Sequence, residues 1–515
     1  MGQQDVDKGD ERTKGAVDSG ILRNSTLNFL GQVVPLGIAA VAVPFIVRDL
    51  GIERYGLLSL SWILLGYVSF LDFGLGRATT NAVAFFSTKG QQEETAGVVW
   101  VSLGINLAVG AVGTLLALWF TPMLVERVFS VPGELREEAV GMFVMLAFSV
   151  PLVTLAMTLR GVLEGVHRFD LANVVKAPSL GMMFLIPMFG KPFALDLGEI
   201  VGLIVLSRLV TLLVYAVFVF RQIPNLLKFH NFRSMKVGFL LRFAGWITVS
   251  NIFSPVLNYA ERLLIPALQP LGVLGFYTAP YEIISRLPML PASVAATLFP
   301  TFSSNKEGDF QAGILDLLVK PTKYLLFLMT PIASVFIFLA PEILELWLGA
   351  VFRERSMFLL PVLSLGFFFN CLAHIPLAAV QGLGRPHWRA RLDMLEAVLF
   401  LSLTVFLIRA FGINGAALSK SLVLFLDVVV MFVLVRRILN VPWSTLIPRQ
   451  MLAFIVLSLV FLLAGLCLTV LDFSFPIRML SFSIGLTIVV SLFWFQTLPE
   501  ERDSMRALVN RFIAR

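Results

Sequence analysis

The chain has 515 residues, of which 57% are hydrophobic and only 14% are charged, and its mean hydropathy is +0.86. About a quarter of the residues in soluble domains are charged, so this composition excludes an ordinary soluble protein and indicates a polytopic membrane protein. The net charge of +7 therefore indicates cytoplasmic loops that face anionic lipid, and we expect no binding to nucleic acid.

Apolar segments long enough to cross a bilayer recur along the chain after a polar start. Residues 1–20 lack the apolar core of a signal peptide, and we expect a disordered cytoplasmic tail there. The rest of the pattern predicts an all-α polytopic membrane protein of about fourteen transmembrane helices. The expected spans are 24–47, 56–86, 96–120, 139–159, 172–190, 198–221, 240–265, 272–302, 324–347, 357–381, 392–411, 413–435, 450–471 and 477–497.

The basic residues between these spans are distributed unevenly. If the amino terminus is inside, the inner segments hold 25 Lys and Arg and the outer segments hold ten. Cytoplasmic loops carry the excess of basic residues in membrane proteins, so we expect both termini in the cytoplasm, as an even number of spans requires.

The second expected span, 56–86, contains the first charges within the membrane. A mostly apolar run from Leu57 to Leu71 leads to Asp72 and Arg77, with two glycines between them. An intramembrane charge costs about 2.5–3.5 kcal/mol on insertion scales, so these residues should be functional or paired with each other. The glycines allow the helix to bend or a neighbouring backbone to come close.

The same stretch resembles a known family. Gly51, Glu53, Tyr55 and Gly56 come before the apolar run, and residues 71–76 read Leu-Asp-Phe-Gly-Leu-Gly. This pattern is similar to the amino-terminal signature of bacterial polysaccharide exporters. These are the lipid-linked oligosaccharide flippases, of the O-antigen type, in the multidrug/oligosaccharidyl-lipid/polysaccharide (MOP) superfamily.

The resemblance implies a flippase of the bacterial cytoplasmic (inner) membrane. Such a protein would move an undecaprenyl-pyrophosphate-linked oligosaccharide to the outer leaflet by alternating access, for the biosynthesis of lipopolysaccharide or another surface polysaccharide. An ion-coupled antiporter of drugs or small metabolites, from the same superfamily, is the alternative.

An internal repeat divides the chain into halves. Residues 164–168 correspond to 381–385, 50–52 to 271–273, and 206–208 to 418–420, with offsets between 212 and 221. Six helices per half is an even shift, so we expect two pseudo-symmetric six-helix lobes in a parallel repeat, with substrate between them. The expected parts are a tail at 1–20, an amino-terminal lobe at 21–222, a cytoplasmic linker at 223–239, a carboxy-terminal lobe at 240–437, two further helices at 450–497 and a cytoplasmic tail at 498–515.

Amides and a hydroxyl recur at helical spacing on the first helix of each half. Amides in lipid are costly unless they are paired or wetted, so these polar faces should line a cavity or bond to neighbouring helices. Paired donors and acceptors also suit sugar hydroxyls. The candidate sugar-contacting residues are Asn24, Asn28, Asn251, Ser254 and Asn258.

Four basic residues lie within spans drawn from both halves. Guanidinium groups bind phosphate oxygens in pairs, and a pyrophosphate that enters a low-dielectric slab needs such partners. Ion pairing with nearby acids is the alternative. The candidate pyrophosphate-binding residues are Arg77, Arg208, Arg286 and Lys420.

Three carboxylates lie within the same spans, namely Asp72, Glu282 and Asp427. A carboxylate in a low dielectric can load and release a proton, or it can bind sodium, so these residues are candidates for ion coupling. A structural ion pair with Arg77, Arg286 or Lys420 is the alternative at each position.

Motifs for catalysis are missing from the sequence. It has no metal-ligand cluster and no glycine-rich loop that would hold a nucleotide phosphate, and only His374 of its four histidines falls within an expected span. We therefore expect a transporter without a cofactor other than a coupling H⁺ or Na⁺; a membrane polymerase is the alternative from the enzyme class. The expected partners are the lipid-linked oligosaccharide, membrane lipids and, as a further candidate, the polysaccharide polymerase or chain-length machinery.

Overall fold

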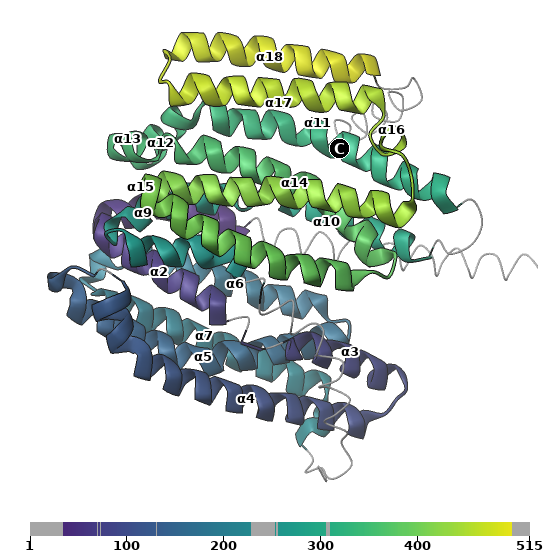
Figure 1. Ribbon diagram of the computed structural model, residues 1–515. Helices are drawn as coiled ribbons and strands as arrows, with labels where there is room; N and C mark the ends of the chain where they lie inside the picture. The colour runs from purple at the N-terminus through teal and green to yellow at the C-terminus, as the bar shows by residue number, and fades with distance from the viewer. Residues whose placement is uncertain are drawn as a thin grey trace, which may run out of the picture. The chain divides into compact units, whose positions relative to one another are not determined.

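The computed structural model describes residues 34–68, 71, 72, 74–129, 131–227, 253, 256–304 and 310–496. All regular elements in these ranges are helices, as the composition predicted (Figure 1). The chain divides by its internal contacts into two compact units, residues 1–275 and 276–515. The expected linker at 223–239 and both expected tails lie wholly or mostly outside the described residues.

The first unit is built around one long central helix, α5, which packs against α2, α3, α4 and α7. Short π or 3-10 turns join several of its helices and keep the connections tight. Its helices are residues 34–50, α2 (Ile52–Val68), α3 (Leu75–Thr88), α4 (Gln92–Met123), α5 (Arg136–Gly165), α6 (Phe169–Met188), α7 (Leu197–Gln222) and residues 256–268.

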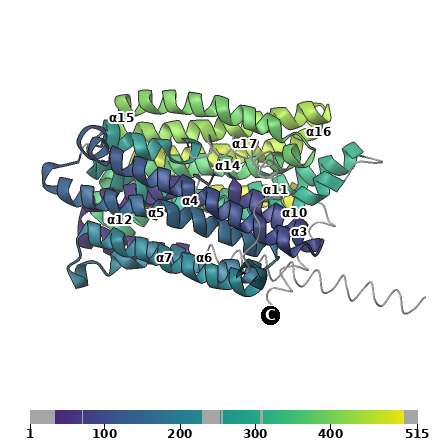
Figure 2. The same ribbon diagram turned by 90° about the horizontal axis from the view of Figure 1, so that it is seen from below.

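In the second unit α14 takes the central place and packs against α10, α11 and α15. Helices α17 and α18 pack against each other and against α11, and Figure 2 shows the helices of this unit seen from below. The helices are α9 (Gly272–Ile284), which crosses the unit boundary, α10 (Met289–Ser304), α11 (Phe310–Phe338), α12 (Ala340–Leu348), α13 (Ala350–Ser356), α14 (Leu359–Gly382), α15 (Pro386–Leu439), α16 (Trp443–Leu446), α17 (Arg449–Val470) and α18 (Phe475–Gln496).

Each predicted span contains helix in the described residues, and eight of the described helices are long and apolar enough to cross a membrane without interruption. The predicted boundary between the spans 392–411 and 413–435 is confirmed. A single residue there, Gly412, has non-helical torsion angles (φ 59°, ψ −138°) and separates two helical halves of α15.

Two predicted spans are each formed by two helices with a break near the middle, and in span 56–86 the bend that the glycines allowed is a full interruption. Span 56–86 is interrupted between α2 and α3, where Gly74 adopts a left-handed conformation (φ 79°) that a glycine reaches without a Cβ penalty. Span 272–302 is interrupted at residues 285–288, between α9 and α10. Pro288 has no backbone N–H to donate and disfavours helical torsion angles at Leu287.

The predicted ninth span, 324–347, was also misplaced. Helix α11 begins at Phe310 and ends at Phe338, and a separate short helix, α12, follows from Ala340. Leu339 has torsion angles outside the helical range, and Pro341 occupies the first turn of α12, where its missing N–H costs nothing.

Glycines let α3 and α5 approach each other within the first unit. A Cβ on Gly161 would lie 2.6 Å from the carbonyl oxygen of Gly76, and one on Gly165 would lie 2.8 Å from that of Thr80. Small residues permit this backbone contact between helices in a membrane, where packing and not water exclusion drives association. The contact holds the second half of the broken span firmly on α5.

Candidate functional site

The break between α2 and α3 is built around Asp72. Its Oδ1 accepts a hydrogen bond from the N–H of Gly74 (2.6 Å), and its Oδ2 accepts one from the N–H of Gly76 (3.0 Å). The first N–H groups of a helix have no partner within it, and a carboxylate there also favours the helix dipole. The buried carboxylate of Asp72 is therefore the cap of α3.

Arg77 follows Asp72 by one turn, yet its side chain is exposed. Within the described ranges no ion pair joins it to Asp72 or to another carboxylate. The predicted alternative of an Asp72–Arg77 pair is therefore not what this structure contains. The guanidinium remains positively charged near the amino terminus of a half-helix, where the dipole also favours anions.

The break between α9 and α10 repeats this order of charges. Glu282 lies in the last turn of α9, and Arg286 lies in the turn that follows; the two form an ion pair of 3.4 Å. Arg286 is half exposed, so this pair does not bury the guanidinium. Glu282 and Arg286 correspond to Asp72 and Arg77 with offsets of 210 and 209. Each half therefore has an acidic residue, a helix break and an arginine in the same order, a correspondence that the internal repeat in the sequence analysis did not include.

Arg208 of α7 has only neutral partners among the described residues. Its Nη1 donates to the Oγ of Ser179 on α6 (2.8 Å), and the hydroxyl of Thr211 donates to the same oxygen (3.0 Å). Its Nη2 lies 4.0 Å from the sulfur of Met183. A guanidinium in such surroundings keeps its charge without a described counter-ion, which makes it an attractive position for an anion.

Lys420 is buried in the second unit between aromatic rings. Its Nζ lies 5.2 Å from the ring centroid of Phe400 and 5.9 Å from that of Tyr281. Cations are attracted to the faces of aromatic rings within about 6 Å. Asp427, which sequence spacing offered as a partner for Lys420, is instead bonded to Arg389.

Arg389 joins three buried carboxylates into one cluster. Its Nε lies 2.7 Å from Asp393 Oδ1, its Nη2 lies 3.5 Å from Glu396 Oε2, and its Nη1 donates to Asp427 Oδ1. The Oε1 of Glu396 has no hydrogen-bond partner among the described residues. His374 of α14 interacts electrostatically with both Asp427 and Arg389.

With every carboxyl group ionised, this Arg389 cluster carries a net charge of −2 if His374 is neutral. Buried charges of one sign are costly unless a cation or a proton offsets them. Arg389 is one of the 25 Lys and Arg that the sequence analysis assigned to the inner segments, and the structure shows that it is engaged in this buried cluster. The signal that could have found the cluster is the i, i+4, i+7 spacing of Arg389, Asp393 and Glu396 on one helix face.

Only one of the five proposed sugar-contacting residues lies within the described residues. Asn24, Asn28, Asn251 and Ser254 lie outside the described residues. Asn258 is exposed, and its main-chain oxygen accepts a hydrogen bond from Arg262 Nη2 (3.1 Å). Cavity lining by these residues stays a prediction. The described residues also contain no group of three or more His, Cys, Asp or Glu placed to hold a metal ion.

Comparison with known proteins gives consistent matches. The model of the family described as "Polysaccharide biosynthesis protein" matches residues 21–306. A "Putative O-antigen transporter" of Shigella flexneri is 30% identical over 423 residues, which are 82% of this chain and 99% of the relative. A "Probable low-salt glycan biosynthesis flippase Agl15" of Haloferax volcanii is 23% identical over 78% of this chain and 80% of the relative.

Two solved structures share the fold at low sequence identity. The lipid II flippase MurJ, in an inward closed conformation, superposes with a TM-score of 0.67 at 15% identity, covering 92% of this chain and 99% of that one. An inward-facing multidrug resistance transporter of the MATE family, in the MOP superfamily, gives 0.65 at 17% identity and covers 79% and 98%.

Proposed function

Because this chain belongs to the polysaccharide biosynthesis protein family, we propose that it is a flippase that moves a lipid-linked oligosaccharide across the cytoplasmic membrane. The substrate is an undecaprenyl-pyrophosphate-linked oligosaccharide, and the two halves expose a central site to either side in turn. The similarity to a putative O-antigen transporter of Shigella flexneri and to a probable glycan biosynthesis flippase of Haloferax volcanii supports this class.

One observation carries the proposal beyond family membership. Arg77 and Arg208 lie within predicted spans, and neither has a carboxylate partner among the described residues. A pyrophosphate headgroup carries about two negative charges, and burying them without partners would cost many kcal/mol. Cations that are not already neutralised by acids are what such a headgroup requires. Arg286, which is paired with Glu282, and Lys420, which lies between aromatic rings, are the candidate cations of the second half.

The test is complementation of a flippase-deficient strain, scored as surface polysaccharide. Alanine at Arg77, Arg208, Arg286 and Lys420 should abolish or strongly reduce export, singly or together. Lysine at the three arginines should restore part of it, because charge is kept while bidentate geometry is lost. The matched control is Arg353→Ala, which removes an exposed arginine paired with Glu345. Intact export in well-inserted alanine variants would remove the anion path.

Transport against a gradient needs a coupling ion, and we assign this role first to Asp427 in the Arg389 cluster. The cluster has more buried carboxylates than cations, so a bound proton would offset its excess negative charge. Asp72 and Glu282 stay candidates, although each already has another bond, to the α3 amides and to Arg286.

Gradient-driven transport in proteoliposomes tests this assignment. Asp427→Asn should abolish the dependence on an imposed H⁺ or Na⁺ gradient while the protein remains inserted, and Asp72→Asn and Glu282→Gln extend the comparison. Asp316→Asn is the control, because Asp316 is an exposed acid with an i, i+4 lysine partner. Unaltered coupling in all three intramembrane variants contradicts the assignment.

The Arg389 cluster is also the reason to test the antiporter alternative, because its excess of carboxylates would attract a cationic drug. Drug-resistance assays on the same strain separate the two. A flippase should leave drug sensitivity unchanged, whereas an antiporter should lower it and should not need Arg77 or Arg208. Contact with a polymerase or with chain-length machinery belongs to the same proposal and can be examined by crosslinking in cells.

A further inference from the structure

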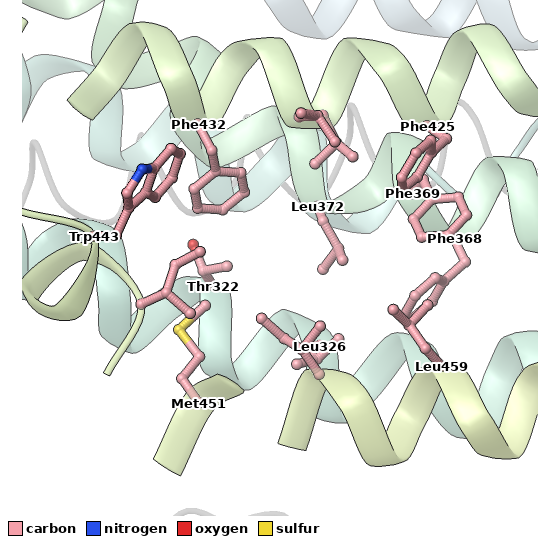
Figure 3. Close-up of a pocket in the computed structure, with 14 residues that line it drawn as sticks. Thr322, Leu326, Phe368, Phe369, Leu372, Phe425, Phe432, Trp443, Met451 and Leu459 are labelled. Atoms are coloured by element: carbon pink, nitrogen blue, oxygen red, sulfur yellow. The ribbon is translucent and has the colours of Figure 1, made fainter. Parts of the chain in front are cut away.

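A cavity of about 270 Å³ lies inside the second unit, at the place where α17 and α16 meet α11, α14 and α15 (Figure 3). None of the charged groups described above belongs to its lining. Its lining is apolar apart from the indole N–H of Trp443 and the hydroxyl of Thr322, which is already engaged with the carbonyl oxygen of Leu318 (2.6 Å). The lining therefore has no charged group and too few polar groups to recognise a sugar or an ion.

The cavity is elongated along the helix axes. Its residues on α15 run from Phe425 to Phe432 and those on α17 from Met451 to Leu459, which are lengths of about 10–12 Å at 1.5 Å per residue. Figure 3 shows Trp443 and Phe432 at one end and Phe425 and Phe369 at the other. The shape fits a length of hydrocarbon chain.

One side of the cavity is open to the surroundings of the protein. Phe425 and Val429 are 38% and 43% exposed, and they continue a stripe of exposed apolar residues on α15 that includes Leu418 and Leu422. On the opposite side Phe368 and Leu326 are buried and close the floor. In a membrane protein such an apolar stripe faces lipid tails, so the cavity is an indentation that lipid can fill.

A positively charged side chain lies at the end of the cavity that Trp443 forms. The guanidinium carbon of Arg436 lies 5.1 Å from the centroid of the Trp443 ring, and Arg437 follows it in the last turn of α15. Tryptophan and basic residues are typical of the membrane interface, and basic residues near it attract anionic lipid headgroups. The apolar cavity and the Arg436–Trp443 pair together match the two ends of one lipid.

We propose that this cavity is a site for an anionic phospholipid of the leaflet that faces Arg436. One acyl chain lies between α15 and α17, and the phosphate lies at Arg436. The lipid fills space between α17 and the helices α11, α14 and α15, and so stabilises the packing of the appended helices. The occupant that we propose is a resident phospholipid and not the polyprenyl tail of a transported substrate. The headgroup of a phospholipid needs only the positive charge of Arg436 at this end of the cavity.

Native mass spectrometry of the full-length protein tests the proposal, with phosphatidylglycerol and phosphatidylcholine of identical acyl chains added separately. The unmodified protein should bind phosphatidylglycerol more tightly. Arg436→Gln should reduce that preference about fivefold, as expected for the loss of one basic residue near a lipid headgroup. Arg437→Gln is the matched control, because Arg437 is exposed at the same helix end and is not placed over Trp443.

Filling the cavity tests the chain-binding part separately. Val429→Trp and, as a second variant, Leu459→Phe should lower the binding of both lipids, whereas Val460→Trp should not, because Val460 is exposed on α17 outside the cavity. Thermal unfolding without added lipid identifies any variant that has lost its fold. Equal binding of both lipids by the unmodified protein, or unchanged binding in both filled variants, overturns the proposal. Displacement of phosphatidylglycerol by an equimolar polyprenyl phosphate overturns the choice of occupant.

Discussion

Three arginines within the described helices carry their charge in three different environments. Arg478 of α18 is 2% exposed and is fully engaged, with Glu342 and the carbonyl oxygens of Phe338 (2.7 Å) and Phe473 (3.0 Å). Arg389 is shared among three carboxylates, and Arg208 has neutral partners. The same side chain is therefore structural in the first environment, whereas in the last it has no described counter-ion.

This contrast predicts that replacing arginine by leucine changes the free energy of unfolding at Arg478 but not at Arg208. Arg478→Leu should lower the free energy of unfolding by about 2–4 kcal/mol, because it leaves Glu342 and two carbonyl groups without their donor. Arg208→Leu should leave unfolding within about 1 kcal/mol of the unmodified protein, since it removes a desolvated charge with no described counter-ion. Thermal or denaturant unfolding in detergent measures both.

Export of surface polysaccharide supplies the other readout for this pair of variants. Arg208→Leu should lose export although it is stable, and Arg478→Leu should lose export only in proportion to its loss of folded protein. A strong destabilisation by Arg208→Leu together with normal specific export would show that Arg208 has a structural role and no ligand.

At the scale of elements, the tight reversal within α15 depends on glycine at two positions. Gly412 has torsion angles that are essentially closed to other residues. A Cβ on Gly415 would lie only 1.9 Å from the carbonyl oxygen of Leu407, so the two halves of α15 touch backbone to backbone. A hydrogen bond between the hydroxyls of Thr404 and Ser419 (3.0 Å) joins the same two halves.

We expect Gly415→Ala to destabilise the protein by at least about 1–3 kcal/mol, because the contact is with backbone and cannot be relieved by turning a side chain. Gly104→Ala on α4 is the control, because a Cβ there meets nothing within 4 Å. It should leave stability unchanged or raise it by up to about 1 kcal/mol. Unfolding of the two purified variants compares them directly, and equal stabilities would mean that α15 can relax at this reversal.

At the scale of the whole molecule, two cations that entered the predicted charge asymmetry are buried in the structure. Arg389, counted on the inner side, belongs to a buried cluster, and Arg478, counted on the outer side, is buried against Glu342. Each side loses one cation, so the excess of basic residues on the inner side remains. Both changes show that a charge near the end of an apolar segment cannot be assigned to a loop by spacing alone.

The remaining asymmetry predicts where reporter fusions will lie. Fusions after Arg242 and after Arg515 should both report cytoplasm, and a fusion near Glu134, between α4 and α5, should report the outside. Paired reporters that are active only on opposite sides of the membrane give the measurement. An external carboxy terminus would show that the number of spans is odd.

The sequence by itself determined the class of fold, because apolar length and the distribution of basic residues act locally and need no knowledge of neighbours. It also located the reversal between residues 411 and 413. Only the tertiary structure decided the partners of the intramembrane charges. Asp72 proved to cap α3, and Asp427 is bonded to Arg389 and not to Lys420. These contacts depend on a broken helix and on a helix folded back on itself, and neither geometry is encoded in residue spacing along a straight helix.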